Sequence, residues 1–195
     1  MVRTLRPALT VFVGLSLLTG LIYPLLVTGI AQVVFPWRAN GSVIAVNGRA
    51  VGSALLGQAF SDPRDFWGRP SATSPQPCNG LASGGSNLGP TNPAQFAAVK
   101  ANVDALHAAD PGNQAPIPVD LVTASASGLD PEISLAAAEY QRDRVARDRH
   151  LSPQAVQRLI DAHRRRPFLG MFGEARVNVL ELNLALDGIR PQRRL

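Results

Sequence analysis

The sequence predicts an α+β protein in which a single N-terminal transmembrane helix is followed by one small extracytoplasmic α+β domain. No Asp, Glu, Lys, Arg or His lies between Pro7 and Trp37, and about 20 apolar residues suffice to cross roughly 30 Å of hydrocarbon. From Arg38 onward the 195-residue chain is rich in Gly, Pro, Ser and Ala, and short strand-like runs alternate with capped helical segments. We therefore divide the chain into residues 1–38 and residues 39–195.

Charge and cysteine content exclude several classes of protein. The 19 Lys and Arg outnumber the 14 Asp and Glu, but the basic residues are mostly Arg interleaved with Asp, which does not indicate a nucleic-acid surface. Cys78 is the single cysteine, so an intramolecular disulfide cannot form. No group of His, Cys and carboxylates has the spacing of a metal site. We expect no nucleic-acid partner and no bound metal.

The residues that flank the apolar run indicate how it sits in a bilayer. Arg3 and Arg6 precede it, while Trp37 and Arg38 follow it, as is typical of the two membrane–water interfaces. The flanking charges are nearly balanced, but a long trailing domain is translocated largely regardless of charge. We expect a cytoplasmic N-terminus and an extracytoplasmic domain.

A cleaved secretory signal is the alternative interpretation of the N-terminal segment. Gly29-Ile30-Ala31 fits the small-x-small pattern of a cleavage site. The apolar run before it is longer than an ordinary signal core, which favours a retained anchor. Cleavage would instead release a free-standing periplasmic binding protein.

Small residues recur within the apolar run at intervals of four, at Ser16, Gly20, Pro24 and Thr28. Small side chains on one stripe let the backbone of another membrane helix approach closely. Gly and Pro are also simply common in membrane helices. The stripe therefore indicates either a partner-packing face or only ordinary membrane composition.

The domain begins with residues that favour strands and then turns. Residues 42–46 are expected to form a strand, Asn47-Gly48 a hairpin turn, and residues 51–60 the return strand. Residues 61–93 are dominated by Pro, Gly, Ser and Asn, so they are expected to be irregular. Phe66 and Trp67 favour an ordered segment over a flexible linker.

Capping residues mark the expected helices. The first expected helix runs from Asn92-Pro93 to Asp110, with Phe96, Val99, Val103 and Leu106 on one face, and a buried strand is expected over residues 119–124. Two further helices are expected, one from Ser134 to about Arg149 and one from Ser152-Pro153 to about Arg164, the latter with Val156, Leu159 and Ile160 inward. The last element is expected to be either a helix from Asn178 to Asp187 or a strand at Val177–Val179.

Candidate catalytic motifs in the domain are incomplete. Ser125 and Ser127 follow the expected strand, but neither has the glycine two residues earlier that a nucleophile elbow uses. The Ser83–Asn87 loop could cradle an anion, yet no Lys-Ser/Thr and helix follow it. A turn whose glycines adopt positive φ explains that loop more simply. We expect no catalytic residues and no independent enzyme.

The helix expected after Ser134 carries opposite charges at i,i+4. Asp143 is spaced in this way from Arg147, and Arg144 from Asp148. Such pairs usually mark a solvated helix face.

Motifs in order along nearly the whole chain resemble those of the C subunit of the bacterial potassium-transporting P-type ATPase complex, the KdpC family. They are Leu5-Arg6-Pro7-Ala8, Tyr23-Pro24-Leu25, Phe35-Pro36-Trp37, Gly68-Arg69-Pro70-Ser71-Ala72, Ser83-Gly84-Gly85-Ser86-Asn87-Leu88, residues 119–130, Gln141-x-x-Arg144-Val145-Ala146, and residues 177–187.

The resemblance implies an accessory subunit of Kdp, the ATP-driven, high-affinity potassium uptake complex of the bacterial inner membrane. Its partners would be the channel-like potassium-binding subunit and the P-type ATPase subunit, and these would handle K⁺ and ATP, so that this chain needs no cofactor of its own. The family is described as a catalytic chaperone that raises the ATP affinity of the P-type ATPase subunit. In that role the Gln141 region, with Arg144, would contact nucleotide. The expected extracytoplasmic placement favours the alternative that the domain covers the potassium entrance, where Gln141, Arg144 and the polar loop residues Ser86 and Asn87 would contact a partner and act on transport through its conformation.

We expect the mature protein to keep residues 1–38 and to resist extraction by alkaline carbonate, because a spanning helix is held by its apolar surface. An impermeant thiol reagent added from outside should reach Cys78 unless the thiol is buried. A chain that begins at Gln32 in the soluble fraction would show instead that the segment is a cleaved signal.

Overall fold

The computed structural model describes residues 2–167, 169–189 and 192–193. The chain divides into two compact units, one that runs to Val43 and also includes Arg193, and one from Ile44 to Gln192. We describe each unit separately.

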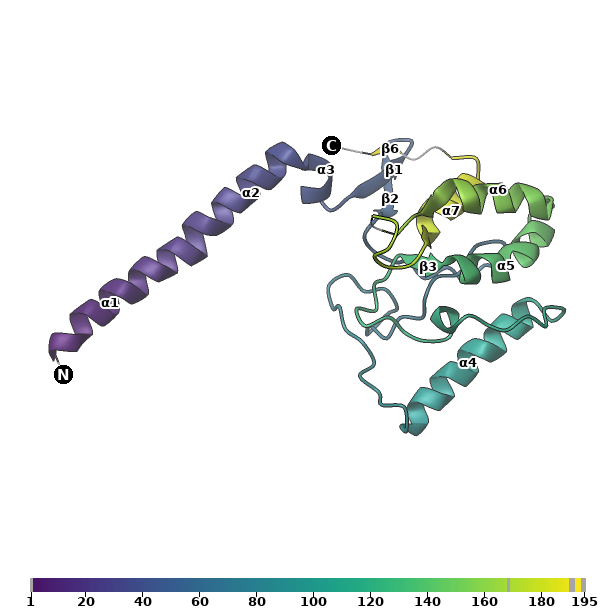
Figure 1. The fold of residues 1–195 in the computed structure, drawn as a ribbon, viewed down its shortest axis with the longest axis horizontal. Helices are drawn as coiled ribbons and strands as arrows, with labels where there is room; N and C mark the ends of the chain where they lie inside the picture. Colours follow the sequence, from purple (N-terminus) through teal and green to yellow (C-terminus); the bar gives the residue numbers. More distant parts are fainter. Residues whose placement is uncertain (1, 168, 190–191, 194–195) are drawn as a thin grey trace. The chain divides into compact units, whose positions relative to one another are not determined.

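The N-terminal unit is a long helix followed by one short helix (Figure 1). It consists of α1 (Val2–Leu17), a π-helical turn η1 (Leu18–Ile22), α2 (Tyr23–Val34) and α3 (Pro36–Ala39). Residues Arg3–Val34 form the one helix in the described part of the chain that is long and apolar enough to cross a membrane. By length and composition, the predicted single spanning helix is confirmed.

The π-helical turn lies immediately before Pro24. Proline has no backbone N–H and cannot donate to the carbonyl four residues earlier, here that of Gly20. The amide of Tyr23 donates to the carbonyl of Leu18, five residues back, which is the wider hydrogen-bond spacing of a π-helix. The extra residue in this turn therefore sits where proline interrupts the regular bonding.

A three-stranded sheet opens the second part of the chain. Strands β1 (Val43–Val46) and β2 (Arg49–Ser53) form the predicted hairpin, and β6 (Gln192–Arg193) completes the order β2-β1-β6. Asn47 and Gly48 have φ of 49° and 80°, as a two-residue hairpin turn with two positive φ angles requires.

The prediction that the return strand reaches Phe60 is wrong, because β2 ends at Ser53. The amide of Gly57 donates to the carbonyl of Leu129 at 2.8 Å. A Cβ atom at Gly57 would lie 2.7 Å from the carbonyl oxygen of Asp130. The chain leaves the hairpin here to pack closely on another loop, and only glycine permits that approach.

A second, antiparallel sheet lies in the domain. Its strands are β3 (Glu132–Ser134), β4 (Arg164–Arg165) and β5 (Arg176–Asn178), in the order β3-β5-β4. Ile133 is paired with Val177, and Val177 also lies opposite Arg164 on the other side.

The described part of the domain contains four α-helices, and each begins at a predicted cap. They are α4 (Pro93–Ala109), α5 (Leu135–Asp148), α6 (Pro153–His163) and α7 (Val179–Leu186), and the side chains that accept a backbone N–H at their N-termini are those of Asn92, Ser134, Ser152 and Asn178. Both alternatives for the C-terminal element are present, because Asn178 ends β5 and also caps α7. Capping residues therefore predicted the starts of these four helices.

The core forms between α5, α6, α7 and β5, with α5 beside α6 (Figure 1). Val156 and Ile160 are fully buried, as predicted, and Leu159 is partly buried against them. On α4, Leu106 is buried and Val99 and Val103 are partly buried. The sequence predicts Phe96 on the same inward face, but its side chain is 65% exposed, because it lies in the first turn of the helix, away from the end that reaches the core.

The strand expected at residues 119–124 is a 3₁₀ turn, η2 (Val119–Leu121), so that prediction is wrong. The hydroxyl of Thr123 donates to the carbonyl of Val119 at 2.7 Å, which closes the turn. Asp120 accepts the amide of Ser134 at 2.8 Å. The apolar side chains of Leu121 and Val122 are still buried, so the pattern correctly indicated burial but not the backbone form.

We expect Gly128→Ala to lower the free energy of unfolding by about 2 to 4 kcal/mol, because a side chain there combines backbone strain with a clash. Gly128 has φ of 66°, and an added Cβ would lie 2.7 Å from the carbonyl oxygen of Gly84. Chemical denaturation of the full chain in detergent measures the effect. Gly112→Ala is the matched control, because its Cβ would meet nothing within 4 Å. Equal losses in the two variants would contradict this account.

Candidate functional site

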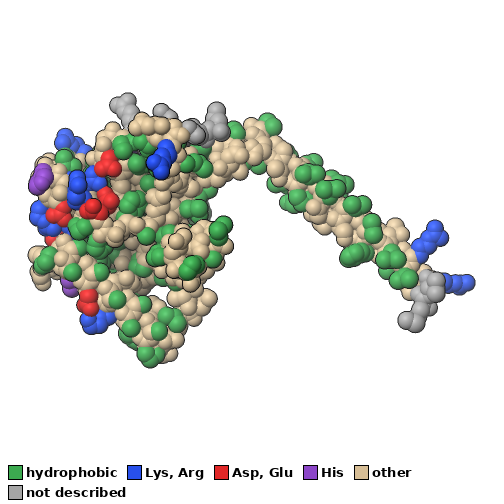
Figure 2. All heavy atoms as spheres, turned by 180° about the vertical axis from the view of Figure 1, so that it is seen from behind, with side chains coloured by type: hydrophobic (Ala, Val, Ile, Leu, Met, Phe, Trp, Pro, Cys, Tyr) green, Lys and Arg blue, Asp and Glu red, His purple; other side chains and the backbone are tan. Residues whose placement is uncertain are grey.

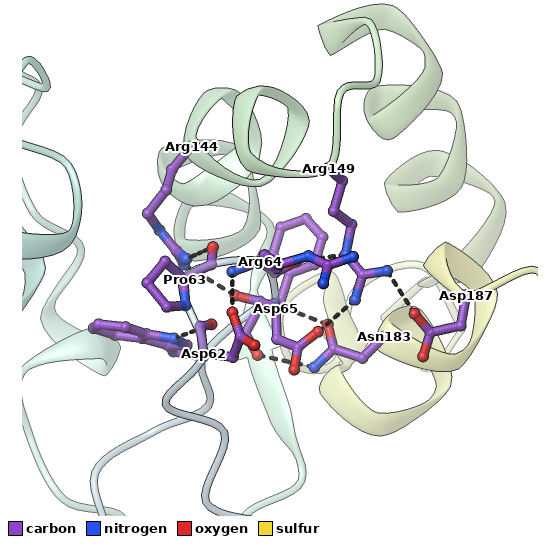
Figure 3. A network of polar contacts seen from close by, with 10 residues as sticks. Asp62, Pro63, Arg64, Asp65, Arg144, Arg149, Asn183 and Asp187 are labelled. Atoms are coloured by element: carbon purple, nitrogen blue, oxygen red, sulfur yellow. Dashed lines mark hydrogen bonds and ion pairs between the residues drawn. The ribbon is translucent and has the colours of Figure 1, made fainter.

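Four polar side chains bind an irregular segment, Asp62–Trp67. Figure 3 shows part of this segment with Arg144, Arg149 and Asn183. We call the four side chains the clamp: Gln141 and Arg144 from α5, Arg149 at the end of α5, and Asn183 from α7. Gln141, Arg144 and Asn183 are 1%, 2% and 3% exposed. The segment they hold belongs to no sheet in the described structure, so its backbone groups must find other partners.

The two carboxamides of the clamp replace a neighbouring strand. Asn183 accepts the amide of Phe66 at 2.8 Å and donates to its carbonyl at 3.0 Å. Gln141 does the same with Trp67, at 2.8 Å and 3.1 Å. Each carboxamide therefore satisfies both backbone groups of one residue, which anchors the fully buried ring of Phe66.

The guanidinium of Arg144 serves the segment from inside the domain. It donates to the carbonyls of Pro63 and Asp65 and, at 2.7 Å, to the side-chain oxygen of Gln141. It also lies 4.8 Å from the centroid of the Trp67 ring, which is within cation–π range. Burial lowers the pKa of Arg144, and the nearby carboxylates, Asp148 foremost, oppose that shift.

Arg149 closes the clamp at the domain edge. Its Nε donates to the carbonyl of Arg64 at 2.6 Å, and its two terminal nitrogens pair with Asp65 and Asp187. Burial by itself lowers the pKa of Arg149, but the hydrogen bonds to the two aspartates outweigh burial, so the pKa is raised. Every carbonyl from residue 63 to residue 67 thus accepts a hydrogen bond from a clamp side chain.

The solvated face with i,i+4 ion pairs that the sequence predicts on α5 does not form, because Arg144 belongs to the clamp. Arg144 points inward instead of pairing with Asp148, and Arg147 pairs with Asp110 and with the adjacent Asp148. Gln141 and Arg144 lie on the same helix face as the buried Ala137. That apolar face was the signal in the sequence that could have placed both side chains inside.

Sequence reasoning missed the other half of the site. Asn183 is a polar residue inside the apolar run Val179–Leu186, which is a sign of a buried hydrogen-bonding role. Arg149 and the Asp62–Trp67 segment carry no comparable local signal, because their partners lie far away in the sequence.

Ser125 and Ser127 hold two loops together. The amide of Ser125 donates to the carbonyl of Pro70 at 3.3 Å. The carbonyl of Ser127 accepts the amide of Gly84 at 2.9 Å and the hydroxyl of Ser83 at 3.0 Å. These contacts are made by backbone groups of Ser125 and Ser127, and they join this loop to Pro70 and to the Ser83-Gly84 loop.

The glycine-rich loop differs from the expected turn. Gly84 and Gly85 do not have positive φ; the positive angle, 53°, belongs to Asn87, a residue type that tolerates it. A Cβ at Gly85 would lie 2.8 Å from the carbonyl oxygen of Ala126, so this glycine serves close packing. Ser86 and Asn87 are exposed, whereas Gln141 and Arg144 lie inside the domain.

Cys78 lies in the same irregular region, partly buried, with φ of 55°. Its amide donates to the hydroxyl of Ser71 at 2.9 Å. Burial raises the pKa of the thiol, and the contact with Ser71 partly offsets this.

An open pocket of about 490 Å³ lies beside β3 and β5, and its charged groups mostly pair with one another. Arg69 bonds to Asp130 at 3.1 Å, and Arg176 pairs with Glu132. Within the described ranges, no three His, Cys, Asp or Glu side chains are grouped so that they could hold a metal ion.

The π-helical turn changes the geometry of the membrane stripe. In a regular α-helix each residue turns the chain by about 100°, so Thr28 would lie about 120° around the helix from Ser16. The one extra residue in the turn that contains Gly20 reduces this angle around the helix axis by about 100°. Ser16, Gly20, Pro24 and Thr28 are thereby brought close to one line.

Comparisons with known proteins agree along almost the whole chain. The sequence model of the KdpC family, described as "K+-transporting ATPase, c chain", matches residues 5–188. A curated protein of Janthinobacterium sp. (strain Marseille) is 62% identical over 187 residues, which cover 96% of this chain and 99% of that protein. A protein of Sorangium cellulosum (strain So ce56) is 63% identical over 190 residues, 97% of this chain and 100% of that protein. Both relatives are named potassium-transporting ATPase KdpC subunit.

We expect Arg144→Met to lower the free energy of unfolding by about 3 to 5 kcal/mol, because the carbonyls it serves lose their partner inside the domain. Arg144→Lys should restore only part of the loss, since an ammonium lacks the planar fork of donors. Denaturation of the full chain in detergent measures both, with the exposed Arg158→Met as control. If Arg144→Met and Arg158→Met were equally stable, the clamp would not hold the segment.

Proposed function

Because the chain belongs to the KdpC family, we propose that it is the accessory C subunit of an ATP-driven, high-affinity potassium uptake complex. The observation that carries the proposal is the family match over residues 5–188, which includes all but the first residues of the membrane helix and the whole clamp. We expect this chain to support assembly and ATP-coupled K⁺ import alongside a channel-like potassium-binding subunit and a P-type ATPase subunit, which we call the two partner subunits.

The proposed arrangement places the helix in the bacterial inner membrane, with a cytoplasmic N-terminus and an extracytoplasmic domain. The length and apolar character of Arg3–Val34 support insertion. Arg3 and Arg6 in the first turns of the helix and the Trp37-Arg38 pair after it support the two interfaces.

In this proposal the chain is not itself catalytic, and ATP cleavage belongs to the P-type ATPase subunit. The carboxamide of Gln141 and the guanidinium of Arg144 are already bonded to the chain's own backbone. We expect them to act by shaping the domain and not by contacting nucleotide. An effect on ATP affinity would then travel through the complex as conformational coupling, typically about 1 to 3 kcal/mol.

Two further surfaces are proposed as partner contacts. Ser86 and Asn87 are exposed on a loop anchored by the Ser127 contacts, so they can act on a neighbouring subunit near the potassium entrance. The stripe from Ser16 to Thr28 offers little side-chain bulk, so a helix of a partner can pack closely against it.

Co-purification from membranes tests the function and the stripe together. We expect the tagged wild-type chain to recover the two partner subunits, identified by mass. Gly20→Leu should reduce their recovery, because a bulky side chain blocks close helix packing. Leu18→Phe should leave their recovery unchanged, because Leu18 lies on the opposite side of the helix. Failure of the wild-type chain to recover either partner would refute the proposed function, whereas equal recovery by the two variants would refute only the stripe.

A further inference from the structure

The domain carries a long surface without charge. None of the 30 residues between Arg69 and Lys100 is Asp, Glu, Lys, Arg or His, although at the chain's average of 17% charged residues about five would be expected. The chain's other long uncharged run is the membrane helix, where lipid explains it. Residues 70–99, which we call the neutral face, are an irregular segment and the start of α4.

The neutral face is surface and not core. Every one of its residues is exposed or only partly buried, and Leu81 and Phe96 are 99% and 65% exposed. A segment inside a core would be uncharged because buried charge is costly. That reason does not apply to residues that contact solvent in this chain.

The neutral face is also ordered, which distinguishes it from a flexible linker. The hydroxyl of Ser71 donates to the carbonyl of Gly128 at 2.7 Å. The amide of Asn79 donates to the hydroxyl of Thr73 at 3.0 Å, and the amide of Gly84 donates to Ser127. The clamp fixes the chain at Trp67, just before this segment begins. The domain thus uses half-buried and exposed hydrogen bonds to hold an uncharged surface in one shape.

The charged side chains gather elsewhere on the domain. Helix α5 carries Arg and Asp close together. Figure 2 shows the charged side chains mainly on one side of the domain, whereas another part of the surface shows only apolar and uncharged polar atoms. An ordinary solvated surface mixes both charge signs throughout. Segregation of this kind is typical of a surface whose centre is covered, because interface cores are depleted of charged residues.

We propose that the neutral face is the docking surface of the domain for another protein subunit of the same complex, and that the facing surface of that subunit is likewise uncharged. The inference rests on the proposed function, since it takes the complex as given. The distribution of charge supports this proposal: although the protein has a net charge of +5, no residue of the neutral face is charged. A charged partner would leave its own charges without counter-charges on burial.

A lipid surface fits the neutral face less well. Segments that dock on membranes combine Lys or Arg with Trp or Tyr, and residues 70–99 contain none of the four. The exposed residues are mainly Pro, Gly, Ala and small hydrogen-bonding side chains. Such a surface suits a protein partner, which offers hydrogen-bond donors and acceptors.

Cysteine labelling in the assembled complex tests the proposal directly. In a Cys78→Ser background, Leu81→Cys places a thiol on the neutral face and Gln154→Cys places one on α6, both at exposed positions. We expect maleimide labelling of Leu81→Cys to slow by about tenfold or more when the two partner subunits are co-expressed, because an interface core excludes solvent. Labelling of Gln154→Cys should stay unchanged.

Labelling in membranes that contain this chain without its partner subunits tests whether lipid or a second copy of the chain covers the neutral face. Slow labelling of Leu81→Cys there would show that lipid or a second copy covers the face, and would overturn the proposal. An unchanged rate on assembly would also overturn it. If the wild-type chain still recovers both partners in that case, the proposed function stands and only the docking surface is wrong.

Charge insertion gives a second measurement that does not depend on labelling. Leu81→Lys and Leu81→Glu should both weaken recovery of the partner subunits, by about tenfold in affinity or more, which corresponds to about 1.4 kcal/mol. The controls Gln154→Lys and Gln154→Glu should have no effect. Equal unfolding midpoints for the four variants in detergent would exclude misfolding. Opposite effects of the two Leu81 variants would reveal a charged partner surface and refute the neutral match.

Discussion

The domain depends on pairing the backbone of Asp62–Trp67 with side chains instead of with a strand. A buried carbonyl without a donor costs free energy, and none of the five carbonyls from residue 63 to residue 67 has a strand beside it to supply one. Two carboxamides and two guanidiniums, all fixed on or beside α5 and α7, supply the donors. The positions of these helices therefore determine where the long irregular region begins.

The sequence predicted those parts of the structure whose causes are local. Ser134, Ser152 and Asn92 cap helices through their own neighbours, and the Asn47-Gly48 turn follows from backbone preference. The strands expected to extend to Phe60 and over residues 119–124 failed because Gly57 packs on Asp130 and Asp120 binds Ser134. Such contacts between distant segments leave no periodicity that a single sequence can reveal.

The same distinction explains the candidate site. A family resemblance points to Gln141 and Arg144, but their burial beneath the segment could be inferred only from the apolar face they share with Ala137. Asn183 and Arg149 act on residues more than 80 positions away. An arginine on a helix rich in Asp suggests a solvated pair, and only the tertiary structure shows that Arg144 faces inward.

Asn178 joins three elements through one side chain. Its amide nitrogen donates to the carbonyl of Ala54, which follows the hairpin, and its oxygen caps α7, the helix that carries Asn183. A mechanical load applied to the chain at Ala54 would therefore pass through Asn178 into α7 and reach Phe66. The end of the hairpin and the segment are thus connected through α7, so a displacement of that helix would be felt at both.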